Sequence, residues 1–231
     1  MFIQYRPEAS GAINMTDDAR LFPISDFAET DSFSFERELF RQGCSIVAGT
    51  DEAGRGPLAG PVVAASVVLP EGCDFTLYKD SKQLPPSARK KLYDQLQEIG
   101  ADIGVGLGTV EEIDRINILQ ASLLAMKKSF ESLSCRPDFL LVDGTFPVPL
   151  FIPQKSLVKG ESRSASIAAA SIVAKEERDR LMAHYDVLFP HYGFSRNKGY
   201  PTAEHRRSIK EHGPCEIHRS SFKGVREYLT G

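Results

Sequence analysis

The chain has 231 residues, of which 42% are hydrophobic and 26% charged, and its formal net charge at pH 7 is −3. These values are typical of a globular protein, and a chain of this length buries enough surface to fold without a disulfide or a structural metal. The four cysteines are far apart and form no C-x-x-C pair. This spacing argues against a zinc site and favours free thiols in a reducing compartment.

Membrane insertion and secretion are also disfavoured. No apolar run reaches the ~20 residues that a membrane span needs, and the N-terminus lacks the basic-then-apolar layout of a signal peptide. We therefore expect a cytoplasmic protein that does not contact a membrane.

Charge is unevenly distributed along the chain. Residues 1–43 contain eight acidic residues and four arginines, whereas residues 189–231 contain eight Lys or Arg residues and four glutamates. A basic C-terminal end on an acidic protein fits a nucleic-acid contact surface, although an ordinary solvated surface would explain the same charges.

The first third of the chain begins with an acidic segment. Residues 1–32 show no clear periodicity, so we expect a poorly ordered extension to one domain over residues 33–231. An apolar stripe predicts a short helix over residues 33–41. Apolar runs at 45–49 and 61–69 predict two strands, and the glycine-rich turns between them predict a hairpin.

The remaining segments alternate between helical and strand patterns. Further strands are predicted at 101–110, 138–143 and 156–158. Helices are predicted near 86–99, 110–117, 118–133, 161–188 and 202–211. Early strands followed by interleaved helices predict an α/β fold, with a central mixed sheet, helices on its faces and a helical C-terminal segment from about residue 189.

Acidic residues follow two of the predicted strands. Asp51 and Glu52 come after the first strand, and Asp143 ends the strand at 138–143. Neighbouring strands lie ~4.8 Å apart, so these carboxylates could converge on one metal ion. Glu161 stands at the predicted start of the long helix, where the helix dipole tolerates a negative charge.

The residue types indicate which metal would bind. Clustered carboxylates either take up protons or bind a hard divalent cation, and oxygen ligands favour Mg²⁺ or Mn²⁺ over zinc. Two such ions about 4 Å apart can catalyse phosphodiester hydrolysis. Each acid taken alone could equally cap a turn or a helix, so the hypothesis depends on their occurring together.

A glycine-rich segment follows Asp51. The sequence DEAGRGPLAGP (residues 51–61) places glycines on both sides of Arg55, which allows backbone N–H groups to approach a substrate and the arginine to reach a phosphate or sugar. An ordinary hairpin turn is the alternative interpretation.

Several motifs of this chain, taken together, resemble those of the ribonuclease HII family. The similar segments are DEAGRG (51–56), DSK (80–82), LVDG (141–144), KGES (159–162), AAASIVAK (168–175), RDR (178–180), YGF (192–194), KGY (198–200), His205 and IHRSSF (217–222). They cover roughly residues 35–225 in order. This resemblance implies a ribonuclease H-like fold with a central mixed five-stranded sheet.

The resemblance also implies roles for individual residues. It assigns Asp51, Glu52, Asp143 and Glu161 as metal ligands for two-metal catalysis, with Mn²⁺ or Mg²⁺. Residues 54–56 (Gly54, Arg55 and Gly56) and Tyr200 would read the RNA–DNA junction, the tyrosine by stacking on the deoxyribose and the glycine turn by contacting the 2′-hydroxyl.

One position departs from the family pattern. The family usually has Asp where this chain has Glu161. The longer side chain could still bind a metal, as a glutamate does in the related ribonuclease HIII enzymes, with a change of metal preference or rate. Ribonuclease HIII also carries a sizeable N-terminal substrate-binding domain, for which the extension here is too short.

Other polar residues are weaker candidates. Possible phosphate contacts, or equally solvated surface residues, are Lys82, Lys159, Ser162, Arg163, Ser164, Arg196 and Lys198. We expect the small residues of 165–174 to provide close helix–sheet packing, Phe194 and Phe222 to be core residues, and His184 to be structural. His205 and His218 are assigned a weak substrate-contact role.

Together these features lead to one functional expectation. The chain would cut the RNA strand of RNA–DNA hybrids, and DNA duplexes on the 5′ side of embedded ribonucleotides, leaving 3′-hydroxyl and 5′-phosphate ends. It would act as a monomer in replication and repair. The alternatives are another nuclease of the same superfamily, such as a junction resolvase or a ribonuclease HIII, and a binding module without catalysis.

Overall fold

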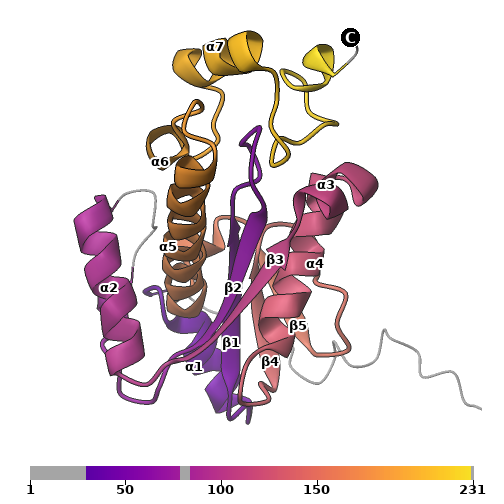
Figure 1. The fold of residues 1–231 in the computed structure, drawn as a ribbon. Coiled ribbons are helices and arrows are strands. Elements are labelled where there is room, and N and C mark those ends of the chain that lie inside the picture. The colour runs from indigo at the N-terminus through magenta and orange to yellow at the C-terminus, as the bar shows by residue number, and fades with distance from the viewer. Residues whose placement is uncertain (1–29, 79–83, 230–231) are drawn as a thin grey trace, which may run out of the picture.

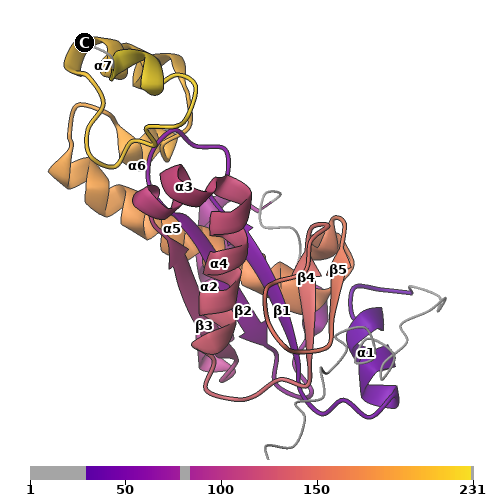
Figure 2. The same ribbon diagram turned by 90° about the vertical axis from the view of Figure 1, so that its right-hand side faces the viewer.

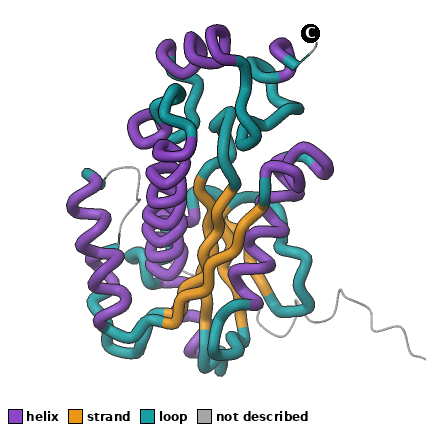
Figure 3. Tube along the Cα trace, in the orientation of Figure 1, coloured by secondary structure: helices purple, strands orange, loops and turns teal. Residues whose placement is uncertain are grey.

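A five-stranded mixed sheet forms the centre of the molecule. The computed structural model describes residues 30–78 and 84–229, and Figures 1 and 3 show the strands gathered between helices. The strand order is β3-β2-β1-β4-β5. The strands are β1 (Val47–Ala53), β2 (Val62–Val68), β3 (Asp102–Gly108), β4 (Phe139–Asp143) and β5 (Gln154–Leu157).

The first three strands form an antiparallel meander, and β4 and β5 are added in parallel to β1. The predicted hairpin is confirmed, because β1 and β2 pair from Gly49–Val67 to Ala53–Val63. The predicted end of the first strand is wrong. Asp51 and Glu52 lie inside β1, since antiparallel pairing with β2 continues past the last parallel pair with β4, Thr50–Val142.

Helices cover both faces of the sheet. They are α1 (Ser34–Arg41), α2 (Pro86–Glu98), α3 (Val110–Ile116), α4 (Ile118–Glu131), α5 (Ala165–Leu188), α6 (Phe194–Asn197) and α7 (Ala203–His212). Within the described residues, three short 3-10 turns are η2 (Phe75–Leu77), η4 (Gly160–Ser162) and η5 (Arg226–Tyr228). Apolar clusters show that α1, α2 and α5 pack on one face, whereas α3 and α4 pack on the other.

The helix α5 lies very close to β1. Every residue from Ala165 to Ala174 is buried, as the small side chains of this segment predict. At Gly49, a Cβ atom would lie 2.3 Å from the backbone of Ser166 and Ile167. A glycine at this position of β1 is therefore what allows the helix backbone to reach the sheet.

The long helix starts later than predicted. Ser164 is its N-cap, with Oγ accepting a hydrogen bond from the Ile167 N–H at 3.2 Å, so Glu161 lies in the preceding turn η4 instead of the first helical turn. The cause is the cap itself, because a serine in extended conformation supplies an acceptor for the first free N–H groups of a helix.

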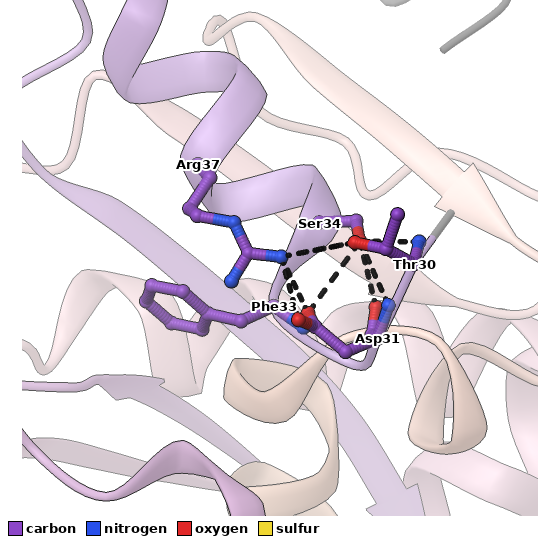
Figure 4. A network of polar contacts seen from close by, with 5 residues as sticks. All are labelled: Thr30, Asp31, Phe33, Ser34 and Arg37. Carbon is purple, nitrogen blue, oxygen red and sulfur yellow. Dashed lines mark hydrogen bonds and ion pairs between the residues drawn. The ribbon is translucent and has the colours of Figure 1, made fainter. Parts of the chain in front are cut away.

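The N-terminal helix α1 holds this cap in place. Glu36 of α1 is buried and accepts hydrogen bonds from Ser164 Oγ (2.6 Å) and from the Ser166 N–H (3.1 Å). The start of α1 is closed by a polar network in which Arg37 binds Asp31 at 2.7 Å (Figure 4). Of the predicted extension over residues 1–32, residues 1–29 lie outside the described residues.

The C-terminal segment forms a helical cap at one end of the sheet. Figure 2 shows α6, α7 and the chain end gathered beside the turn between β1 and β2. Its core includes Phe194, as predicted, together with Leu58, Met182 and Ile209. Phe222 is partly buried against this cluster. None of the described helices is both long and apolar enough to span a membrane.

Replacing Gly49 with alanine tests the α5–β1 contact. We expect Gly49→Ala to lower the free energy of unfolding by about 2–3 kcal/mol, because its Cβ would overlap the α5 backbone. Urea unfolding measures this. Gly100→Ala is the control: its Cβ meets no atom within 4 Å, and its left-handed backbone alone should cost about 1 kcal/mol. Equal losses of stability in the two variants would contradict a close contact between Gly49 and the α5 backbone.

Candidate active site

Two acidic side chains from neighbouring strands lie at the same end of the sheet. Asp51 and Asp143 stand one position beyond the last parallel pair of β1 and β4. Both side chains are on the face covered by α5. Gly49 and Leu141 lie two residues earlier and contact α5, and side chains two residues apart on a strand point to the same face. They line a cavity of about 360 Å³. The other lining residues are Glu52, Ala53, Gly54, Arg55, Gly56, Ser171, Lys175, Arg178 and Tyr200.

Asp51 is the electrostatic centre of this cavity. Its side chain is 3% exposed. Burial, together with the nearby charges of Glu52, Asp143 and Glu161, holds the pKa of Asp51 well above its usual range, and a hydrogen bond with Ser171 opposes that rise. The four acids that the sequence singled out therefore lie close enough to interact.

The turn η4 is attached directly to the end of β4. Asp143 Oδ1 accepts a hydrogen bond from the Gly160 N–H at 2.7 Å, and a Cβ at Gly160 would lie 3.2 Å from the same oxygen. The next residue, Glu161, is buried, and its Oε2 accepts a hydrogen bond from Ser171 Oγ at 3.1 Å. Ser171 of α5 thus connects Glu161 to the neighbourhood of Asp51.

Glu52 occupies a different position from the other acids. Side chains alternate along a strand, so Glu52 points away from the α5 face, and it also lines a second hollow beside α4. Its Oε1 lies 3.2 Å from Arg55 Nη1. In the described residues, no group of three or more His, Cys, Asp or Glu side chains is spaced to hold a metal ion.

Two buried arginines shape the glycine-rich loop between β1 and β2. Arg178 of α5 is 1% exposed, and its guanidinium donates to the carbonyls of Ala59 (3.1 Å), Pro61 (3.1 Å) and Lys198 (2.9 Å). At Gly54, whose φ is +101°, a Cβ would lie 2.0 Å from Arg178 Nε. Only glycine fits between this arginine and the cavity.

Arg219 holds the same loop from the C-terminal segment. It is fully buried and donates to four backbone carbonyls, those of Gly54 (2.5 Å), Arg55 (2.9 Å), Pro57 (2.8 Å) and Gly60 (2.8 Å). Burial lowers the pKa of Arg219 to about 9 and that of Arg178 to about 10. Both remain charged at neutral pH, so each supplies charge-assisted hydrogen bonds to the loop.

Tyr200 faces the loop from the C-terminal segment. Its ring is close to Gly56, where an added Cβ would lie 3.5 Å from Cε1, and 45% of the residue is exposed. The carbonyl of the preceding residue, Gly199, accepts a hydrogen bond from the Leu58 N–H at 2.8 Å. This bond fixes the distance between the glycine-rich loop and the segment that contains Tyr200.

Comparison with known proteins assigns this arrangement to a family. The model of ribonuclease HII matches residues 48–225. Ribonuclease HII of Syntrophotalea carbinolica is 53% identical, covering 90% of this chain and 99% of its own length. Ribonuclease HII of Geobacter sulfurreducens is 54% identical, covering 85% of this chain and 91% of its own length. The chain belongs to the ribonuclease HII family. It is therefore a ribonuclease H, a hydrolase.

Solved structures agree with this ribonuclease HII assignment. Ribonuclease H2 of Pyrococcus horikoshii has a TM-score of 0.65 and 30% identity, covering 79% of this chain and 96% of its own. A ribonuclease HIII named Bst-RNase HIII, solved in complex with Mn²⁺, has a TM-score of 0.60 and 19% identity over 80% and 69%, and shares the fold. The predicted ribonuclease H-like fold is confirmed.

The other predicted contacts lie away from this ribonuclease HII cavity or cannot be placed. Lys82 falls outside the described residues. The residues that line the cavity do not include Lys159, Ser162 or Arg163, and the guanidinium of Arg163 packs 5.1 Å from the ring of Phe35. Their substrate role stays a prediction.

The structure corrects one assignment and adds several residues. His205 and His218 are buried, so the expected substrate contact by their side chains is wrong. Ser171, Lys175 and Arg178 line the cavity but were not singled out. Successive members of this set are four and three residues apart on α5, which places them on one face of the helix. This spacing was the signal in the sequence that could have identified them.

Removing one buried charge tests the electrostatics of the site. We expect Asp51→Asn to raise the stability of the metal-free protein at pH 7 by roughly 1 kcal/mol, or about 2–4 °C in Tm, because it removes a charge that burial and, after it, the neighbouring acids disfavour. A carboxyl group whose pKa is raised in the folded state destabilises that state only at pH values above its unfolded pKa, which is 3.8 for Asp51. The stability gained by Asp51→Asn should therefore shrink as the pH falls toward 4.

Thermal unfolding in EDTA measures this difference. Asp94→Asn is the control, because Asp94 is an exposed residue paired with Lys90 on α2 and lies outside the cavity. A Tm for Asp51→Asn at or below that of the parent at pH 7 would contradict the repulsion.

Proposed function

We propose that this protein cuts the RNA strand of RNA–DNA hybrids and cuts DNA duplexes on the 5′ side of embedded ribonucleotides, leaving 3′-hydroxyl and 5′-phosphate ends. Its role would be ribonucleotide removal in DNA replication and repair. The observation that carries the proposal is the shared cavity, which Asp51 and Asp143 line together with the glycine-rich loop and Tyr200. The two aspartates are suited to cations that bind a phosphate, and the loop with Tyr200 is suited to the sugars next to that phosphate.

The cofactor we propose is Mg²⁺ or Mn²⁺, held by Asp51, Glu52, Asp143 and Glu161. The donor set fits by chemical type, since it offers only oxygen ligands, and the carboxylate form of Asp51 is disfavoured without a cation, by burial and by the neighbouring acids. Bound divalent ions would supply charge for the attacking and leaving oxygens of the phosphodiester, two ions being held once substrate is present. The Mn²⁺ complex of the ribonuclease HIII relative supports this choice.

The glycine-rich loop would provide the selectivity for RNA. Arg219 binds the carbonyls of Gly54, Arg55 and Pro57, which favours a loop conformation with the N–H groups of residues 54–56 toward the cavity. We propose that they contact the 2′-hydroxyl, the group that distinguishes RNA from DNA. Tyr200, with its partly exposed ring, would stack on the following deoxyribose.

Basic residues around the cavity would contact the phosphates. Lys175 lines the cavity and is paired with Asp179 at 2.5 Å. Lys82, Lys159, Ser162 and Arg163 remain proposed contacts along the duplex, and together they would make binding salt-dependent. We propose that the active unit is a monomer. The catalytic domain would span residues 33–231, with residues 1–32 as an extension.

A cut-site experiment separates the proposal from its rivals. The substrates are end-labelled duplexes that differ only in one ribonucleotide, an RNA–DNA hybrid and a four-way DNA junction, each tested with and without Mg²⁺. A junction resolvase would cut the four-way junction without a ribonucleotide, and ribonuclease HIII activity would spare the single ribonucleotide. A binding module would bind hybrid without Mg²⁺-dependent products.

The variant Asp143→Asn tests the metal-binding role. We expect cleavage to fall by about 10³-fold or more, because the loss of a central carboxylate removes metal-assisted catalysis worth several kcal/mol. Single-turnover cleavage of the one-ribonucleotide duplex measures this. Asp94→Asn is the matched control on α2 and should cleave like the parent. Retained cleavage by Asp143→Asn would exclude the role.

Glu161 calls for a separate pair of variants. Glu161→Asp keeps the charge and shortens the reach, whereas Glu161→Gln keeps the length, so its side chain can still accept from Ser171. If Glu161 binds the cation, the glutamine variant should lose roughly 100-fold and the aspartate variant less than 10-fold. Titration of cleavage with Mg²⁺ and with Mn²⁺ measures both, and the opposite order would show a purely structural role.

A further inference from the structure

Two buried histidines lie behind the backbone of Tyr200. His205 of α7 is fully buried and His218 is 4% exposed, and their Nε2 atoms are 3.0 Å apart. Aromatic rings surround the pair: Tyr192 is 4.9 Å from His218 and Phe194 is 5.4 Å from His205, between ring centroids in edge-on contacts. Neither imidazole lines the cavity.

The hydrogen bonds determine where the protons lie. The Cys215 N–H donates to His218 Nδ1 at 2.9 Å, and the Cys215 Sγ and carbonyl oxygen lie 3.1 and 3.3 Å from the same nitrogen. Because the backbone N–H is the shortest contact and can only donate, we assign Nδ1 as the acceptor and the proton of the neutral ring to Nε2. His218 Nε2–H then donates to His205 Nε2. The proton of His205 is therefore on Nδ1, which donates to the carbonyl of Tyr200 at 2.9 Å.

Burial supports the neutral form of both rings. It lowers the pKa of His205, and it lowers the pKa of His218 to about 4, with the neighbouring His205 as a further cause. A second proton would place two N–H groups against each other between the rings. At neutral pH the pair therefore forms one continuous chain of hydrogen bonds from Cys215 to Tyr200.

This chain ends on the residue whose ring faces the glycine-rich loop. The Tyr200 carbonyl also accepts from the Thr202 N–H at 2.8 Å, and the Tyr200 N–H donates to the Asn197 carbonyl at 2.9 Å. The backbone of Tyr200 is thus fixed on both sides, while its ring remains partly exposed beside Gly56. The direction of the ring depends on these backbone bonds.

We propose that His205 is a positioning residue that orients Tyr200 for recognition of the ribonucleotide junction, through its hydrogen bond to the Tyr200 carbonyl, and that His218 fixes the tautomer in which His205 donates this bond. The inference deepens the proposed function and rests on the stacking role of Tyr200. Neither histidine touches the substrate. They link α7 and the segment of residues 215–218 to the one aromatic ring of the cavity.

Two substitutions at His205 separate its two hydrogen bonds. In His205→Asn, the amide Nδ2 takes the place of Nδ1–H and can still donate to Tyr200, but the bond to His218 is lost. In His205→Gln, the amide Oε1 takes the place of Nε2 and can accept from His218, but the bond to Tyr200 is lost. His212→Gln, at an exposed position at the end of α7, is the control.

The readout is kcat/KM on a DNA duplex with one ribonucleotide, with Tm measured for each variant. We expect His205→Gln to lose roughly 10- to 100-fold, whereas His205→Asn stays within about 3-fold of the parent. His218→Gln, whose amide N–H can still donate to His205, should also stay near the parent. His218→Leu, which removes this donor and leaves the tautomer of His205 unfixed, should lose activity and serves as the second variant if His205→Gln is unstable.

A double-mutant cycle with Tyr200→Ala tests the route of the effect. If His205 acts through Tyr200, His205→Gln should cause no further loss in the Tyr200→Ala background. Equal losses for His205→Gln and His205→Asn, or additive losses with Tyr200→Ala, would overturn the inference and leave the proposed function intact. Full activity of Tyr200→Ala would exclude the stacking role and with it the inference, whereas absence of cleavage by the parent chain would show that the proposed function itself is wrong.

Discussion

The close approach of α5 to β1 is the constraint on which the site depends. Because Gly49 has no side chain, the helix backbone reaches the strand, and the residues farther along α5 are carried past its acidic end. Ser171 then lies between Glu161 and Asp51, and Arg178 reaches the glycine-rich loop. One helix thus positions parts of both walls of the cavity, so its distance from the sheet sets their separation.

The charges of the site are divided between two tasks. Arg178 and Arg219 are buried, and their guanidinium groups bind backbone carbonyls of the loop. These charge-assisted hydrogen bonds stabilise the conformation of the loop. The negative charge around Asp51 remains available for a cation, at a cost in stability to the metal-free fold. The charge that destabilises the metal-free fold is the same charge that would attract a cation.

Much of the site could be predicted because its signals are local. Asp51 and Asp143 each follow a strand-like run, and parallel neighbours end at the same edge of a sheet, so their convergence follows from the pattern. The glycines at 54 and 56 were recognisable in the same way. The position of Glu161 was predicted less well, since a serine cap three residues later decides where α5 begins. The histidine pair was misassigned because spacing in sequence says nothing about burial.

The sequence by itself determined the order of strands and helices, the acidic residues and the glycine-rich loop, because hydrophobic periodicity and turn chemistry act over a few residues. Only the tertiary structure decided that Arg219, 165 residues after Gly54, binds its carbonyl, and that two histidines 13 residues apart form one chain of hydrogen bonds to Tyr200. Such contacts arise when distant segments are buried against each other and their polar groups must find partners there.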